Sequence, residues 1–229
     1  MVSIEDHSGV AVVTIDRPPV NAMSIELLEA VVGALVTVTA DPPAAVVLAG
    51  RPGAFSAGVD LKAVVDYTPE QHRQSVRLIN TMALAGYELP CPVVSAITGH
   101  AIAGGFVLAV VGDHRVASDA GKYGLTEVKV GVPFPQAAIG VVLAELGPSA
   151  GRQLALGNQL VDAGECVRLG AFDEAVAADD VVPRALEVAS AMAALPADVY
   201  ARTKNDLRGA VIARLRSAAE SDPLLDDLI

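Results

Sequence analysis

Two glycine-containing corners, each following an apolar run, are the parts of this sequence best suited to chemistry. Residues 45–50 lead to the corner at 54–61 (AFSAGVDL), and residues 92–97 lead to the corner at 99–105 (GHAIAGG). Glycine lacks a Cβ atom, so the backbone can turn sharply there and a ligand can approach it closely. A helix that starts at such a corner offers unpaired N–H groups to an oxygen that gains negative charge. Two such donors would form an oxyanion hole, which stabilises an enolate beside a carbonyl. Alternatively, the glycines only let a helix and a strand pack closely.

The corners need strands before them and a helix after the second one. Residues 45–50 and 92–95 are apolar and rich in valine, which is typical of strands covered on both faces. Residues 106–111 are apolar on every side, which predicts a helix inside the core. Further elements are predicted from periodicity, caps and prolines: a strand at 10–16, a helix capped by Ser24, a helix opened by the capping box Thr68 to Gln71, a strand at 114–118, helices at 137–145 and 163–169, and helical structure from Pro183 onward.

Three segments, in sequence order, resemble the signature segments of the crotonase (enoyl-CoA hydratase/isomerase) family: residues 54–62, 99–113 and 123–131. Residues 17–23 are similar to the N-terminal segment of that family. The resemblance implies an α/β fold of the ClpP/crotonase type, a spiral of ββα units with a helical C-terminal region. It divides the chain into a spiral core at 1–175 and a helical region at 176–229, which would serve oligomerisation and cover part of the site within one continuous domain.

The same resemblance assigns roles to individual residues. The backbone N–H groups of Val59 and Gly104 would be the oxyanion-hole donors, and Glu127 would be the catalytic acid/base. The positions expected to contact CoA are Ala57, Asp60, Leu61 and Lys62, and those expected to line the substrate pocket are Ala22, Met82, Gly105 and Val107.

The acid/base residues are where this sequence departs from the family pattern. Family hydratases have two glutamates, and the first of these positions is occupied here by Val107, whereas the second is present as Glu127. Valine cannot hold a water molecule or transfer a proton, but one carboxylate beside an enolate can move a proton between two carbons. We therefore favour Δ3 to Δ2 enoyl-CoA isomerase chemistry. Enoyl-CoA hydratase is the alternative enzyme, and a non-catalytic acyl-CoA carrier is the alternative from another class.

Composition limits the partners. The chain has 229 residues, 52% of them hydrophobic, and a formal net charge of −11 at pH 7. This charge argues against nucleic acid and against an anionic membrane surface. A chain so apolar is expected to hide surface in an oligomer, and the family resemblance implies a homotrimer or a dimer of trimers. The resemblance implies no metal and no separate cofactor, because CoA is part of the substrate.

The sequence also predicts a cytoplasmic protein. Two cysteines are too few for a disulfide framework, and Glu5 and Asp6 interrupt the N-terminus before any apolar run. Residues 89–112 carry no Asp, Glu, Lys or Arg, but their prolines and glycines favour a strand, a corner and a buried helix over a membrane span. Residues 221–229 depart from the family pattern, and we expect them to fall short of a last helix that helps to cover CoA.

Overall fold

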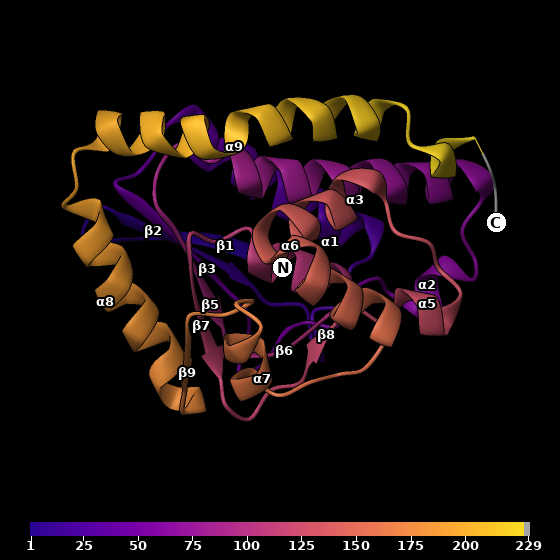
Figure 1. Cartoon of the computed structure of the whole chain (residues 1–229), viewed down its shortest axis with the longest axis horizontal. Helices are drawn as coiled ribbons and strands as arrows, with labels where there is room; N and C mark the ends of the chain where they lie inside the picture. The colour runs from indigo at the N-terminus through magenta and orange to yellow at the C-terminus, as the bar shows by residue number, and fades with distance from the viewer. Residues whose placement is uncertain (227–229) are drawn as a thin grey trace.

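A six-stranded sheet runs through the computed structural model, which describes residues 1–226 (Figure 1). Its strands lie in the order β1-β2-β3-β5-β7-β9, with β1 antiparallel to β2 and all other neighbours parallel. Parallel strands need crossover connections, and these connections carry most of the helices. The strands are β1 (Val2–His7), β2 (Val10–Ile15), β3 (Ala45–Ala49), β5 (Val93–Ile97), β7 (His114–Ser118) and β9 (Glu174–Val176).

A second, three-stranded parallel sheet makes the fold repetitive. It contains β4 (Gly53–Ser56), β6 (Gly99–Ile102) and β8 (Tyr123–Gly124), each of which directly follows a strand of the large sheet. Each of these strands is in turn followed by a short helix: α2 (Leu61–Val64), α4 (Gly104–Val110) and α5 (Glu127–Val130). The chain therefore makes three successive ββα units. The predicted spiral is confirmed.

Helices cover both faces of the large sheet, which explains why its strands are apolar on both sides. Val10 and Val12 of β2 lie on one face and pack in a cluster with helix α8 (Val181–Ala193), whereas Val13 and Ile15 lie in the cluster on the other face. That second cluster includes side chains of α1 (Ile25–Ala40), α3 (Pro69–Glu88), α4 and α6 (Gln136–Gly157). In Figure 1, α8 runs along one side of the sheet, away from these other helices.

The predicted helix starts are confirmed by their caps. The Ser24 hydroxyl accepts a hydrogen bond from the Leu27 N–H, and Thr68 and Gln71 form a reciprocal capping box at the start of α3. Asp162 caps α7 (Ala163–Arg168) through the Glu165 N–H. These caps were predictable because both partners lie within one turn of helix.

An edge strand was missed by the sequence-based expectation, whereas a break in one long helix was expected. Strand β1 was not predicted, since its side chains are mostly exposed and it pairs only as an edge strand. Helix α6 contains a kink at Gly147, where the helix expected at 137–145 was predicted to end, and helical geometry resumes after it. Gly147 has φ 68° and ψ 173°, a conformation that glycine adopts readily.

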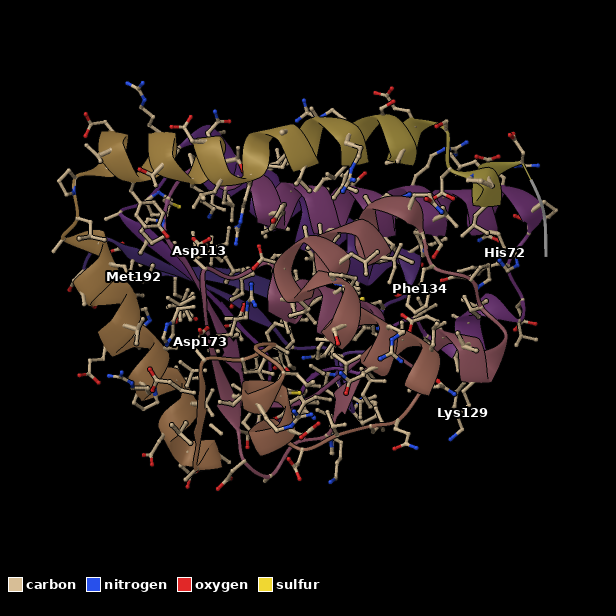
Figure 2. The ribbon with its side chains drawn as sticks, viewed as in Figure 1. His72, Asp113, Lys129, Phe134, Asp173 and Met192 are labelled. Carbon is tan, nitrogen blue, oxygen red and sulfur yellow. The ribbon has the colours of Figure 1, made fainter. Side chains whose placement is uncertain are left out.

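The last long helix, α9 (Ala197–Glu220), packs against α3 and α6 and is held by a buried group of charges. Asp113 accepts hydrogen bonds from the Val93 N–H at 2.9 Å and from Lys204 Nζ at 2.7 Å, and Arg208 pairs with it at 2.9 Å. Arg208 also pairs with Glu145 of α6 at 3.0 Å. Figure 2 shows Asp113 beneath α9. Asp113 therefore has a structural role, because its carboxylate joins β5 to α9.

The charge-free run at 89–112 folds as the sequence predicts, into strand β5, strand β6 and the buried helix α4. Among residues 1–226, no helix has the length and apolar character required to cross a bilayer.

Candidate active site

One cavity of about 250 Å³ receives residues from all three ββα units. Each unit contributes the residues that follow its small-sheet strand: Ala57 and Val59 after β4, Ala103 and Gly104 after β6, and Thr126 and Glu127 after β8. The remaining walls come from α2, α3, the loop at 131–135, the start of α6 and Leu224. In Figure 2, His72 and Phe134 lie at this end of the molecule, well away from Asp113.

A second cavity of about 480 Å³ lies between the end of α6 and α7. Its lining includes Arg152, Leu156 and Glu165 but none of the residues that follow β4, β6 and β8 in the first cavity. The smaller cavity is therefore the candidate site, because only there do backbone donors and a buried carboxyl group meet.

The first corner is held by Asn21, a fully buried residue with φ 51°. Its side-chain amide donates to the carbonyl oxygens of Ile15, Ala54 and Phe55 at 2.8–3.1 Å. Its own carbonyl accepts from the Ser56 hydroxyl at 2.8 Å. These bonds tie the corner to the segment after β2, so the backbone at Val59 has a fixed position.

The second corner contains a strained residue directly before the helix. Ala103 has φ 54° and ψ −125°, outside the regions that L-residues usually adopt, and Gly104 is the first residue of α4. The two corners also interlock. A Cβ atom added to Gly58 would lie 2.8 Å from the Ile102 carbonyl oxygen, and one added to Gly105 would lie 2.3 Å from the Ser56 carbonyl oxygen. These two positions require glycine because each lies against main chain of the other corner.

The N–H groups of Val59 and Gly104 are available to a ligand. Within residues 1–226, neither group donates a hydrogen bond to the protein, and Ala103 provides no side-chain cap for α4. Both residues line the same cavity. The helix N-terminus adds partial positive charge at Gly104, so the two groups suit an oxygen that becomes negative.

Glu127 is the buried carboxyl group of the cavity, with 8% of its surface exposed. Its Oε2 atom is buried and has no hydrogen-bond partner among the described residues. Burial raises the pKa of Glu127 to about 7, and the N–H groups of Glu127 and Thr126 offset part of this effect. A carboxyl group with this pKa can both accept and return a proton near neutral pH.

Val107 also lines the cavity, on α4, and is 1% exposed. A position that could face the substrate from the second unit is therefore apolar. The polar side chains of the lining, apart from Glu127, are His72, Ser75 and Thr126.

Six of the eleven residues that the sequence pointed to line this cavity: Ala57, Val59, Leu61, Gly104, Val107 and Glu127. Five others do not. Met82 faces the core from α3 with no exposed surface, Gly105 packs on Ser56, and the Ala22 carbonyl accepts from Arg17 at 2.8 Å. Asp60 caps α2 and pairs with Arg17 at 3.0 Å, while Lys62 is exposed on that short helix.

Sequence reasoning assigned no role to Asn21, Phe134 or Leu224. Asn21 lies in the segment 17–23 that resembles the family, and an asparagine two residues after a proline pair is a recognisable turn signal. Phe134 and Leu224 reach the cavity only through tertiary packing, and no local pattern marks them.

The comparisons with known proteins agree with this geometry. The family model described as enoyl-CoA hydratase/isomerase matches residues 5–224. The chain is 34% identical over 175 residues to the probable enoyl-CoA hydratase EchA17 of Mycobacterium tuberculosis, covering 76% of this chain and 67% of that protein. It is 33% identical over 227 residues to mouse mitochondrial enoyl-CoA delta isomerase 1, covering 97% of this chain and 78% of that protein. The crystal structure of human mitochondrial delta3-delta2-enoyl-CoA isomerase superposes with a TM-score of 0.92 at 28% identity, covering 98% and 90% of the two chains.

Proposed function

Because the chain belongs to the enoyl-CoA hydratase/isomerase family and has the crotonase fold, we propose that it is an isomerase that converts 3-enoyl-CoA thioesters to 2-enoyl-CoA thioesters. The observation that carries the proposal is the buried carboxyl group of Glu127, whose Oε2 atom has no hydrogen-bond partner within residues 1–226, in a cavity that also holds two backbone N–H groups left unpaired by those residues. Relatives named as hydratases and relatives named as isomerases have similar sequence identity to this chain. The reaction is therefore inferred from the cavity itself.

The proposed reaction is a proton transfer between two carbons. The Glu127 carboxylate removes a proton from C2, and the electron pair of that C–H bond shifts toward the thioester oxygen to form a dienolate. The N–H groups of Val59 and Gly104 stabilise the negative oxygen. Glu127 then returns the proton to C4, and the double bond forms between C2 and C3. A pKa near 7 suits a group that must first accept a proton and then donate it. This reaction needs no second acid/base.

Hydration of 2-enoyl-CoA is the second candidate, and one observation favours it. His72, Ser75 and Thr126 place polar atoms in the cavity lining and could hold a water molecule near Glu127. Hydration would then need Glu127 alone to activate that water and to supply the proton to C2.

The decisive experiment measures both activities on the same preparation. We expect conversion of 3-enoyl-CoA to exceed hydration of 2-enoyl-CoA, and Glu127→Gln to reduce isomerisation about 100-fold or more while acyl-CoA binding persists. Val107→Glu supplies the second carboxylate and should raise hydration relative to isomerisation. Faster hydration than isomerisation in the unmodified protein would refute the proposal. If the unmodified protein binds acyl-CoA but shows neither activity, it would instead be an acyl-CoA carrier.

We also propose that the chain acts in the cytoplasm, without a metal or separate cofactor, as a homotrimer or a dimer of trimers. Exposed apolar side chains support self-association: Leu156 is 71% exposed, Leu143 43% and Leu160 42%. Leu143 and Leu156 lie on α6, and Leu160 lies after it, beside β8. Sedimentation equilibrium tests the assembly, and a mass close to the 23.4 kDa of one chain would contradict it.

A further inference from the structure

A short turn after α9 brings the C-terminal part of the described chain back to the cavity. Residues Pro223–Leu225 form a 3₁₀ turn, and the Asp222 side chain caps it by accepting a hydrogen bond from the Leu224 N–H at 3.0 Å. In Figure 1 this turn lies beyond the end of α9, at the same end of the molecule as α2 and α5. It belongs to none of the three ββα units.

Buried hydrogen bonds fix the turn against two helices. Asp222 is 1% exposed, and its Oδ2 atom accepts from the Asn80 side-chain amide and from the Gln136 N–H, both at 2.8 Å. Asn80 is 2% exposed, and its Oδ1 atom accepts from the Ala137 N–H at 2.9 Å. Asp222 and Asn80 therefore cap the start of α6 together and hold the turn between α3 and α6.

These contacts determine where Leu224 lies. Asp222 contacts α3 at Asn80, and the Leu225 carbonyl accepts from Arg73 Nε at 3.1 Å, almost two turns earlier on the same helix. Leu224 lies between these two anchors, and its side chain joins Val76 and Ile79 of α3 in the cavity lining.

The cavity is small for an acyl-CoA site. Its volume of about 250 Å³ compares with roughly 150 Å³ for a protein cavity that accommodates benzene, so it has room for roughly ten non-hydrogen atoms. We propose that Leu224, positioned by Asp222, is a specificity-determining residue that closes the acyl cavity and restricts the substrates to thioesters of short and medium chain length. This proposal rests on acyl-thioester binding, which is part of the function proposed above.

The experiment compares saturated and 3-enoyl-CoA thioesters of 4, 8, 12 and 16 carbons in the full-length chain. For the unmodified protein, affinity and kcat/KM should rise up to about eight to ten carbons and then level off or fall. Leu224→Ala removes three carbon atoms from the wall, and Leu224→Phe adds ring volume to it. We expect the kcat/KM ratio of the 12-carbon to the 8-carbon substrate to rise about tenfold or more in Leu224→Ala and to fall in Leu224→Phe.

Leu225→Ala is the matched control, because it makes the same change one residue along and its side chain is not part of the cavity lining. Asp222→Ala removes the side chain that holds the turn. It should shift the dependence of kcat/KM on chain length in the same direction as Leu224→Ala. An unchanged profile in both Leu224 variants, with activity retained, would overturn the proposal and leave the isomerase intact. If no isomerase activity is found, the Kd values of the saturated thioesters still decide, since a shift toward longer chains in Leu224→Ala supports the cavity wall independently of the reaction.

Discussion

Replacing Glu127 by glutamine should make the protein more stable at alkaline pH while it removes the proposed acid/base. Burial raises the pKa of Glu127 from 4.5 to about 7, because the ionised form loses its hydration inside the cavity. Between these two values the unfolded chain has released the proton, whereas the folded chain retains it. Stability contributed by the protonated group is therefore fully present below pH 4.5 and is lost as the pH rises through 7.

The size of this effect follows from the two pKa values. One pKa unit corresponds to about 1.4 kcal/mol, so ionised Glu127 lowers the free energy of unfolding by about 3 kcal/mol at pH values well above 7. Glutamine has nearly the same shape and does not titrate. The difference in unfolding free energy between Glu127→Gln and the unmodified chain should therefore grow from below about 1 kcal/mol at pH 5 to about 3 kcal/mol at pH 8.5, apart from a constant offset.

Urea unfolding at fixed protein concentration, repeated across this pH range, measures the difference directly. All other titrating groups are common to both proteins and cancel in the comparison. In parallel, kcat/KM of the unmodified enzyme should rise toward a plateau above pH 7, because the base must be ionised. A difference in stability that stays constant from pH 5 to pH 8.5 would refute the reasoning, since it would show that the carboxyl group titrates alike in both states.

Three further predictions concern the corners and the charges beneath α9. Gly104→Pro should lower activity about 100-fold or more, because it removes a donor N–H and disturbs the corner at Ala103, whereas Gly104→Ala, whose Cβ would lie 3.2 Å from the Met23 Sδ atom and 4.0 Å from the Gly58 Cα atom, should retain most of the turnover. Asn21→Ala should lower kcat more than it raises KM, since the Val59 donor loses its support; steady-state kinetics on a variant with native circular dichroism checks this. Asp113→Ala should cost about 3–5 kcal/mol in urea unfolding, because it leaves buried Lys204 without a carboxylate partner and Arg208 with Glu145 alone; a cost below about 1 kcal/mol would contradict the assigned role of the cluster.

Local signals in the sequence predicted most of the fold. Ser24, Thr68 and Asp162 mark helix starts because a capping side chain bonds to a backbone group only two or three residues away. The valine-rich runs mark strands covered on both faces, and β5 and β7 lie where they were expected. The family resemblance then supplied the spiral topology, which no periodicity in the chain could have given.

Residues joined across long stretches of sequence were not predictable in this way. Asn80 and Asp222 are separated by 142 positions, and each alone looks like an ordinary polar residue. The helical spacing of Met82 fits either the pocket or the core, and only the packing of α3 places it in the core. The sequence also gave no sign that Glu127 is buried, because its burial depends on the surrounding corners and on the loop at 131–135.

The two corners fix the backbone of this site by direct main-chain contact, whereas the side chains around the cavity come from separate elements. Main chain contacts main chain at Gly58 and Gly105, so the relative position of the two donors is independent of the side chains around the cavity. In the proposed reaction, the backbone therefore determines which intermediate is stabilised, a thioester enolate. Val107 and Leu224 line the cavity from separate elements, and we propose that such side chains decide what happens to that intermediate and which acyl group is accepted. Substitution at those positions can therefore change the reaction or the substrate without rebuilding the oxyanion hole, which makes this scaffold a suitable starting point for new thioester chemistry.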